Sequence, residues 1–498
     1  MSVDDLIRLR GEIDEIDAQL IELLQRRMDV AAGVARYKLE RGLPVLDAGR
    51  EEQKLRDIAG RCRSELAESV TRLYREIFTL SRDYQQGLID AAHSKFGLLG
   101  ERLGHSYSPQ IHAMLYENEY GLYEVAPEKL GEFLQNTELA GMNVTIPYKK
   151  AVIPYCAALS DTARRIGSVN TLVKRADGWH GDNTDYDGFA YMLRSSGVDV
   201  RGKKAVVFGS GGASLTVRAV LEDFGAARVV VVSRSGEDNY ENLSRHADAA
   251  VAVNATPVGM YPNNGTAVVD LRALPGLEAV LDLVYNPAKT ALLLQAGELG
   301  IPCRNGLGML VAQAKRAAEL FTGKAIDDGR IEEITRALAR QMGNIVLIGM
   351  PGCGKSSVGR ALAKRLGREF FDADRLVASE AGVSIPEIFE KEGEAGFRRR
   401  ETAALAELCK RSGCVIAAGG GCVTKPENLP LIRQNGAAVW IKRELDKLPS
   451  RGRPLSQAHG VQALYGQRKA LYEQFADVSV ENSAGIDDCA ERILEALK

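Results

Sequence analysis

The stretch NIVLIGMPGCGKSSVGRALAKRLG, Asn344 to Gly367, decides the fold of the C-terminal part of the chain. It starts as an apolar strand, passes through a glycine loop and continues as an amphipathic helical pattern. The loop fits the pattern G-x-x-x-x-G-K-[ST] at Gly349, Gly354, Lys355 and Ser356. In this setting backbone N–H groups and the helix N-terminus hold phosphate, the lysine reaches the outer phosphates and the serine can ligate Mg²⁺. We therefore predict an α/β domain that binds a nucleotide.

A second glycine loop, VFGSGGAS from Val207 to Ser214, has a different design. It lies between two strand patterns, and Gly209 and Gly211 match G-x-G-x-x-G with Ser214 at the third glycine. A strand–turn–helix–strand unit of this kind favours dinucleotide binding. The second strand ends at Arg234, where NAD-binding proteins carry an acid, and an arginine there suits the 2′-phosphate of NADP. An α/β domain that binds no dinucleotide is the alternative at this loop.

Composition excludes several classes of protein. The chain has 498 residues, 45% of them hydrophobic and 26% charged, with a formal net charge of −2. This length suits three or four soluble domains, and the charge gives no basic surface for nucleic acid. No apolar run reaches the roughly 20 residues of a membrane span, and the charged start does not fit a signal peptide. Eight scattered cysteines without a C-x-x-C pair favour a reducing cytoplasm over a zinc or disulfide framework.

The pattern of predicted helices and strands changes twice along the chain and predicts domains of residues 1–90, 94–342 and 343–498. The first is all helical, because apolar residues recur at helical spacing from about Asp4 to Leu39. Such a long helix needs a partner to cover its apolar stripe, so we expect a homodimer. The second alternates strands and helices, with a Rossmann part at about 200–285, and the third is a phosphate-loop α/β domain.

Helical spacing predicts that several polar and charged side chains of the N-terminal segment share helix faces. Arg27 and Lys38 lie 11 residues apart, about three turns, and therefore share a face over roughly 16 Å. Arg10 lies roughly 100° away from that face, so we expect it to serve the partner's pocket in a dimer. Ser81 and Gln85 share a face of the third helical pattern.

From Gly343 to Lys498 the motifs FFDAD, GEAGFRRRE, AAGGGCV, RGRPLS and RKALYEQFADVSV follow in order, and this region resembles shikimate kinase. The resemblance implies that Asp372 helps to hold Mg²⁺ with Ser356 and that Asp374 is the base. It implies that Arg398, oriented by Glu401, and Arg468 bind the substrate carboxylate, and that Gly420 lets backbone approach the ring. The ATP-binding residues that it implies are Gly352, Gly354, Lys355, Ser356, Ser357 and, from a lid, Arg453.

From Phe96 to Gln341 the motifs GERLGHSYSPQIH, GMNVTIPYKK, GSVNTL, GDNTDYDG, VNATPVGM, DLVYNPAKT and NGLGMLVAQA are similar to shikimate dehydrogenase. The similarity implies a two-lobed α/β fold in which Lys149 and Asp185 are the catalytic pair. Substrate-binding residues implied in the same way are Ser106, Ser108, Thr145, Asn170, Tyr285 and Gln313. NADPH-binding residues are Gly209, Gly211, Gly212, Ala213, Ser233, Arg234 and Gly306. The stretch between Ser235 and Asn254 is short, which predicts a reduced Rossmann half.

Residues 4 to 86 resemble the all-helical chorismate mutase, on LRGEIDEID, LLQRR, ARYK, LPVLDAGRE and LSRDYQQ. The resemblance implies an intertwined dimer. Its implied catalytic residues are Arg27, Lys38 and Gln85, and its implied substrate-binding residues are Arg10 of the partner, Asp47, Arg50, Glu51 and Ser81. The rearrangement of chorismate needs no base, nucleophile or metal, because positioning and charge stabilisation suffice.

The three resemblances together predict a trifunctional cytoplasmic enzyme with small-molecule substrates. It would reduce 3-dehydroshikimate to shikimate with NADPH, phosphorylate shikimate with ATP and Mg²⁺, and convert chorismate to prephenate. One alternative is a bifunctional dehydrogenase–kinase whose helical segment only dimerises. Another is a binding or regulatory protein in which one or more of these sites is silent.

Overall fold

The computed structural model describes residues 3–41, 43–93, 96–104, 106–116, 119–449, 457 and 459–497. The chain divides into two compact units. The first consists of Met1–Asn183 with Ala317–Ala325, and the second of Thr184–Arg316 with Ile326–Lys498.

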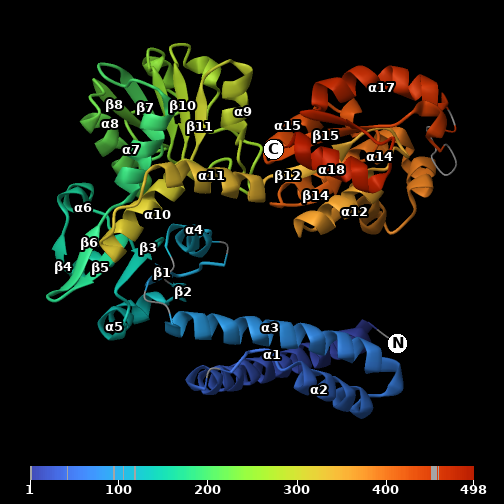
Figure 1. Ribbon diagram of the computed structural model, residues 1–498, viewed down its shortest axis with the longest axis horizontal. Helices are drawn as coiled ribbons and strands as arrows, with labels where there is room; N and C mark the ends of the chain where they lie inside the picture. The colour runs from blue at the N-terminus through green and yellow to red at the C-terminus, as the bar shows by residue number, and fades with distance from the viewer. Residues whose placement is uncertain are drawn as a thin grey trace. The chain divides into compact units, whose positions relative to one another are not determined.

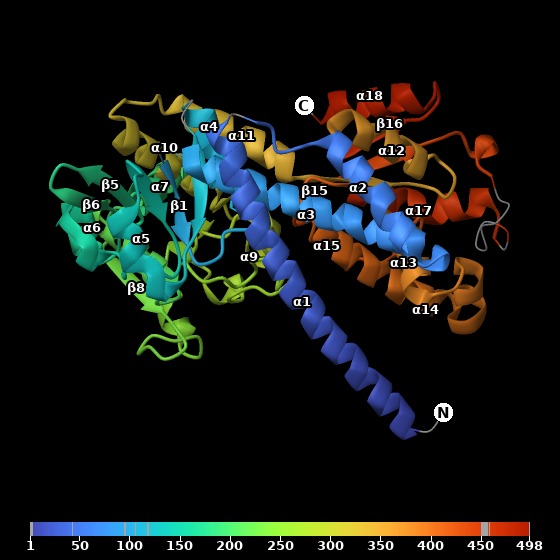
Figure 2. The same cartoon turned by 90° about the horizontal axis from the view of Figure 1, so that it is seen from below.

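The first unit begins with three helices, α1 (Val3–Glu40), α2 (Ala48–Arg61) and α3 (Ala67–His93). The predicted long first helix is confirmed. The third helix packs against both of the others (Figure 1). Figure 2 shows the first half of α1 extending away from α2 and α3. Its apolar side chains are therefore left in solvent, among them Leu6, Ile13, Ile16, Leu20 and Leu23.

The rest of this unit is an α/β lobe built on one mixed sheet in the order β2-β1-β3-β5-β6-β4. Strands β5 and β6 run antiparallel to each other, and β5 is antiparallel to β3. A core around Leu99, Met142 and Trp179 fills one face. The elements are β1 (Phe96–Gly100), α4 (Ser108–Leu115), β2 (Tyr120–Glu124), α5 (Leu130–Asn136), β3 (Gly141–Val144), β4 (Cys156–Leu159), α6 (Asp161–Ile166), β5 (Thr171–Arg175) and β6 (Gly178–Asp182).

The second unit opens with a parallel sheet in the order β11-β10-β9-β7-β8. Its strands are nearly continuous apolar runs because both faces are covered. The connection from β8 to β9 contains only a short 3₁₀ turn, Leu243–His246, in place of the usual crossover helix. The Rossmann half is reduced there, as its short sequence predicts. The elements are α7 (Asp185–Ser196), β7 (Lys204–Phe208), α8 (Gly212–Asp223), β8 (Arg228–Val232), β9 (Val251–Asn254), β10 (Ala279–Asp282), α9 (Ala291–Glu298), β11 (Cys303–Asn305), α10 (Leu307–Thr322) and α11 (Gly329–Met342).

A second parallel sheet in the same unit has the order β13-β14-β12-β15-β16. The fully buried β12 lies at its centre and leads into the glycine loop. In such sheets ligands bind beyond the carboxyl ends of the strands, which is where this loop lies. The elements are β12 (Asn344–Ile348), α12 (Lys355–Leu366), β13 (Phe370–Asp372), α13 (Ala373–Ala381), α14 (Ile385–Cys409), β14 (Val415–Ala417), α15 (Asn428–Arg433), β15 (Gly436–Lys442), α17 (Val461–Phe475), β16 (Val478–Glu481) and α18 (Ile486–Ala496). The predicted sequence of helical, two-lobed and phosphate-loop folds is confirmed.

Candidate active sites

The glycine loop after β12 needs glycine at three positions. Gly349, Gly352 and Gly354 have φ angles of 141°, 86° and 107°, which other residues rarely adopt. A Cβ on Gly349 would also lie 2.5 Å from the carbonyl oxygen of Ile441. The buried Lys355 donates from Nζ to the carbonyls of Gly349 at 2.8 Å and Met350 at 3.1 Å. The loop therefore holds the Lys355 cation at the N-terminus of α12, and a helix N-terminus favours an anion.

Acidic residues follow the neighbouring strand β13. Asp372, its last residue, accepts a hydrogen bond from the Ser356 hydroxyl at 2.6 Å. Asp374 lies in the first turn of α13, and its buried Oδ1 has no hydrogen-bond partner among the described residues. Burial, with the neighbouring charge of Asp372, raises the pKa of Asp374 above its ordinary value, although the charges of Lys355 and Arg398 oppose this rise. The Asp374 carboxyl lines the cavity of this site, and the Ser356 and Asp372 oxygens suit a hard cation such as Mg²⁺.

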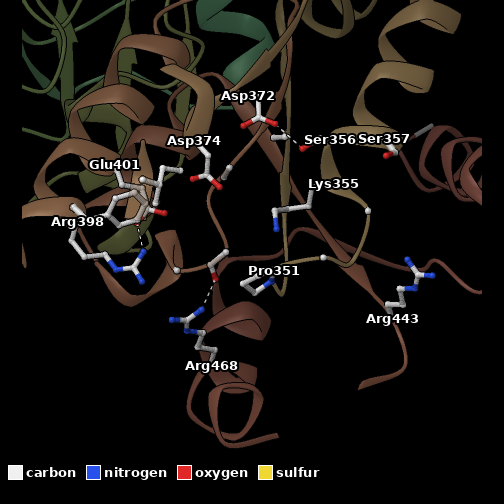
Figure 3. Close-up of a pocket in the computed structure, with 18 of the residues that line it drawn as sticks. Pro351, Lys355, Ser356, Ser357, Asp372, Asp374, Arg398, Glu401, Arg443 and Arg468 are labelled. Carbon is white, nitrogen blue, oxygen red and sulfur yellow. Dashed lines mark hydrogen bonds and ion pairs between the residues drawn. The ribbon is translucent and has the colours of Figure 1, made fainter. Parts of the chain in front are cut away.

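Two buried arginines complete this site (Figure 3). Arg398 donates from Nη1 to Glu401 at 2.6 Å and from Nη2 to Glu394 at 3.0 Å. Arg468 donates to the carbonyl of Gly420 at 3.2 Å. Together with the loop they line a cavity of about 420 Å³, which holds most of the kinase residues predicted from sequence. Those residues are Gly352, Gly354, Lys355, Ser356, Ser357, Asp372, Asp374, Arg398, Gly420 and Arg468. The predicted lid residue Arg453 lies outside the described residues.

The triple glycine after β14 explains how these charges come so close. A Cβ on Gly419 would lie 2.0 Å from Glu401 Oε1 and 2.8 Å from Asp374 Oδ1. A Cβ on Gly420 would lie 2.6 Å from Pro351. The missing side chains therefore make room for the carboxylates and the glycine loop.

The three N-terminal helices line a separate cavity of about 320 Å³, which combines charged side chains with apolar ones such as Val30, Val34 and Phe78. Seven of the eight mutase residues predicted from sequence line it, and they come from α1, α3 and the start of α2. The seven are Arg27, Lys38, Asp47, Arg50, Glu51, Ser81 and Gln85. The eighth, Arg10, is exposed on α1 and does not line this cavity.

Two polar atoms in this cavity are buried without a hydrogen-bond partner in the described part of the chain, and others are bonded within it. Among the described residues, Arg27 Nη1 and Gln85 Oε1 are buried and have no hydrogen-bond partner. Gln85 Nε2 donates to Ser81 Oγ at 3.3 Å, and Lys38 donates to the Val45 carbonyl. A buried polar group without a partner is costly, so this pattern favours a polar ligand. Asp47 caps α2 by accepting from the Arg50 N–H at 3.0 Å.

The second glycine loop, between β7 and α8, has the backbone that its sequence predicts. Gly209 has a φ of 101°, and a Cβ there would lie 2.7 Å from Thr256. Gly211 caps α8, which starts with Gly212 and Ala213. Ser214, at the third glycine position, donates to the Gly211 carbonyl at 2.6 Å.

Three more residues, Ser233, Arg234 and Gly306, are predicted to contact the dinucleotide. Ser233 is half-buried and Arg234 is exposed, just after the end of that strand. A Cβ on Gly306 would lie 2.0 Å from the Leu283 carbonyl oxygen, so only glycine fits there. A glycine turn that leads into a helix N-terminus is the arrangement that binds a dinucleotide phosphate in Rossmann folds.

The lobe of the first unit carries five of the predicted dehydrogenase residues: Ser106, Ser108, Thr145, Lys149 and Asn170. Ser106 Oγ accepts from the Ser108 N–H at 3.2 Å at the start of α4. Asn170 is buried, and its Oδ1 accepts a hydrogen bond from Thr171 Oγ1 at 3.0 Å. Thr145 follows β3 and Lys149 lies a few residues further on, both half-buried.

The remaining predicted dehydrogenase residues lie in the second unit. Asp185 is the first residue of α7. Gln313 on α10 donates to the Leu310 carbonyl at 2.9 Å and accepts from Thr184 Oγ1 at 3.5 Å. Tyr285 is half-buried in the loop after β10. Because Lys149 belongs to the first unit and Asp185 to the second, their catalytic pairing stays a prediction.

Comparison with known proteins gives each region a family. The family model described as shikimate kinase matches residues 351–498, and that of chorismate mutase type II matches residues 9–86. The shikimate dehydrogenase substrate-binding domain matches residues 98–172. The shikimate dehydrogenase (NADP(+)) of Clostridium perfringens strain SM101 is 36% identical over 264 residues, which cover 49% of this chain and 97% of that protein. The chain belongs to the shikimate dehydrogenase family. It is a multifunctional enzyme of the shikimate pathway, with chorismate mutase, NADP(H)-dependent shikimate dehydrogenase and shikimate kinase domains.

Solved structures with similar sequences are also known. A chorismate mutase/shikimate 5-dehydrogenase fusion protein from Clostridium acetobutylicum is 39% identical, with a TM-score of 0.48 over 49% of this chain and 96% of that one. The shikimate 5-dehydrogenase from Thermus thermophilus, solved with NADP(H) and shikimate, is 31% identical, with a TM-score of 0.45 over 49% and 98%.

Sequence reasoning missed three cations at these sites of the shikimate pathway enzyme: Lys54 and Arg82 at the mutase cavity and Arg443 at the kinase cavity. Arg82 lines the mutase cavity and pairs with Glu51. It follows Ser81 directly, and neighbouring residues point about 100° apart on a helix, so a helical-face argument assigns Arg82 to solvent. Arg443 lines the kinase cavity just after β15 (Figure 3). Its position beyond the carboxyl end of a parallel strand is the signal that could have found it.

Proposed function

We propose that each of the three domains is catalytically active through the residues described above. The observation that carries this proposal is the mutase cavity. Seven residues chosen from sequence line one enclosure, and two of its buried polar atoms have no partner among the described residues. A helical module that only dimerises has no need of such a cavity, which favours the trifunctional enzyme over the dehydrogenase–kinase alternative.

In the kinase domain Asp374 would accept the proton of the attacking hydroxyl of shikimate. Arg398 and Arg468 would bind the substrate carboxylate, because the guanidinium fork matches its two oxygens. ATP phosphates fit the glycine loop and Lys355, with Arg453 from the lid as a further proposed contact. Mg²⁺, held by Ser356 and Asp372, would offset phosphate charge during the transfer.

In the dehydrogenase domain Lys149 and Asp185 would form the catalytic pair, with Lys149 donating to the oxygen of the ring ketone. Lys149 would stabilise the negative charge that develops on this oxygen and supply the proton. Ser106 and Ser108 would hold the substrate carboxylate. The ring oxygens would meet Thr145, Asn170 and Gln313, and Tyr285 would line the site. NADPH supplies the hydride when bound, and we propose that Arg234 favours its 2′-phosphate.

In the mutase domain Lys38 and Gln85 would stabilise the ether oxygen, which gains negative charge as its bond breaks. Arg27 and Arg50 would bind the carboxylates and hold the substrate in its reactive conformation. Asp47, Glu51 and Ser81 would hold the ring hydroxyl of the substrate and the protein backbone beside it.

The mutase domain would act as a homodimer. Ile13, Ile16, Leu20 and Leu23 on α1 are each more than half exposed, at 55%, 54%, 57% and 57%. An apolar stripe of this length on a soluble protein marks an interface, and a second copy of α1 is the matching surface. Arg10 of the partner subunit would then reach the cavity. A variant with Ile16→Asp and Leu20→Asp is expected to become monomeric by light scattering and to lose chorismate turnover.

The proposal keeps domain boundaries at 1–90, 94–342 and 343–498 and a cytoplasmic location. All eight cysteines are free thiols in the structure, which suits a reducing compartment. No helix among the described residues is long and apolar enough to cross a membrane.

The direct test is one preparation of the whole chain in three assays. Chorismate alone, without nucleotide or metal, should yield prephenate. 3-Dehydroshikimate with NADPH should yield shikimate, and addition of ATP and Mg²⁺ should then yield shikimate 3-phosphate. Absence of prephenate from a folded dimer would reduce the N-terminal domain to an assembly module.

A further inference from the structure

Arg82 and Glu51 form an ion pair inside the mutase cavity that none of the proposed roles explains. Arg82 lies on α3 next to Ser81, and Glu51 lies in the first turn of α2. Arg82 Nη1 donates to Glu51 Oε1 at 2.7 Å and to Oε2 at 2.5 Å. Both side chains line the cavity, and they are only 30% and 28% exposed.

The guanidinium is anchored at both of its ends. While Nη1 bonds to the Glu51 carboxylate, Nη2 donates to the Thr79 hydroxyl on the same helix at 3.0 Å. Two bonds to one carboxylate and one to a neighbouring hydroxyl leave the Arg82 side chain little freedom. The pair therefore fixes the place of the Glu51 oxygens relative to Ser81 and the rest of α3.

The other charges of the cavity suggest what the Arg82–Glu51 ion pair does for substrate binding. The substrate of the proposed reaction carries two carboxylates and a hydroxyl, and the cavity holds the cations Arg27, Lys38, Arg50 and Lys54. A carboxylate such as Glu51 can accept a hydrogen bond from the hydroxyl, but it repels both carboxylates. An arginine on Glu51 offsets that charge and leaves the oxygens able to accept.

We propose that Arg82 is a positioning residue for Glu51, which orients its carboxylate toward the substrate hydroxyl and offsets its repulsion of the dianion. This inference rests on the proposed mutase function. It assigns Arg82 to substrate binding and leaves the rearrangement itself to the residues around the ether oxygen. Loss of Arg82 should therefore raise KM for chorismate with little change in kcat.

The test is a double-mutant cycle on the full-length dimer with chorismate as substrate. Arg82→Met keeps the apolar stem and removes the guanidinium, and we expect KM to rise on the order of tenfold while kcat stays within about threefold. In the Glu51→Gln background no charge is left to offset, so the same change at Arg82 should alter KM by less than about threefold. Arg82→Lys, which keeps the charge and cannot bridge Glu51 and Thr79, should give an intermediate KM. It serves as the second variant if Arg82→Met does not fold.

Arg63→Ala is the matched control, because Arg63 pairs with Glu65 on the surface at 3.2 Å and does not line the cavity. It should leave KM unchanged, and thermal unfolding should show that every variant is folded. An equal rise in KM from Arg82→Met in both backgrounds would overturn the inference, because Arg82 would then act independently of Glu51. A wild-type chain without chorismate turnover would instead overturn the mutase assignment, and this inference with it.

Discussion

Glu401 in the kinase site offers a sharp test of how Arg398, the arginine proposed to bind the substrate carboxylate, is held in place. Its side chain is 1% exposed, and its Oε2 accepts from Arg398 Nη1 at 2.6 Å. A hydrogen bond between charged groups contributes about 1.5–3 kcal/mol, which corresponds to roughly 10- to 150-fold in an equilibrium constant. Glu401→Gln keeps an oxygen acceptor and removes the charge, so we expect the lower part of this range. KM for shikimate should rise about 10- to 30-fold.

The assay is steady-state phosphorylation with shikimate and ATP varied in turn. KM for ATP should stay within about twofold, because Glu401 contacts Arg398 and not the glycine loop. Glu394→Gln is the control: this residue also pairs with Arg398, at 3.0 Å, but it is 48% exposed and should cost less than about 1 kcal/mol. If a folded Glu401→Gln enzyme kept its KM for shikimate, Glu401 would not orient Arg398. Equal effects at Glu394 and Glu401 would show that burial does not set the strength of the pair.

Three more perturbations follow from other parts of the structure. Gly419→Ala would place a Cβ 2.0 Å from Glu401 Oε1, so phosphorylation should fall at least about 100-fold while NADPH oxidation persists; equal loss of both activities would indicate unfolding. Burial lowers the pKa of His112 to about 3, so below its ordinary pKa of about 6.5 the folded state binds fewer protons than the unfolded state. The lobe should therefore lose about 2 kcal/mol between pH 7 and 5. Hydrogen exchange should show this loss in wild type and not in His112→Gln. Arg234→Ala should raise KM for NADPH and leave KM for NADH unchanged; an unchanged preference would remove Arg234 from cofactor selection.

The fold could be read from the sequence because its strongest patterns are local. The loop at Gly349 and the turn at Gly209 each require glycine for backbone reasons, and each lies between a strand and a helix. The long first helix follows from apolar spacing alone. The short connection after β8 predicted a reduced Rossmann half, although the 3₁₀ turn that replaces the helix could not be foreseen, because nothing in its sequence specifies that turn.

The sites were predictable to a smaller extent, because their geometry depends on contacts far apart in sequence. The spacing of Arg27 and Lys38 predicted one shared face, and both residues line the mutase cavity. The order of the kinase motifs predicted that Asp374 and Arg398 share a site, and both line the kinase cavity. The sequence did not predict that Arg82 lines the mutase cavity, because an argument from helical faces ignores how far a long side chain can reach. The sequence presents Gly419 only as one member of a glycine run. Its proximity to two carboxylates depends on the packing of α13, which carries Asp374, against α14, which carries Glu401.

The central claim, three independent catalytic sites in one chain, is tested most directly by three variants in three assays. Lys38→Ala should abolish only chorismate turnover, Lys149→Ala only NADPH oxidation with 3-dehydroshikimate, and Asp374→Asn only shikimate phosphorylation. Each variant should keep the other two activities within about twofold of the wild type. Loss of two or three activities from a folded single variant would contradict independent sites, and a wild-type chain without one of the activities would contradict the account of that domain.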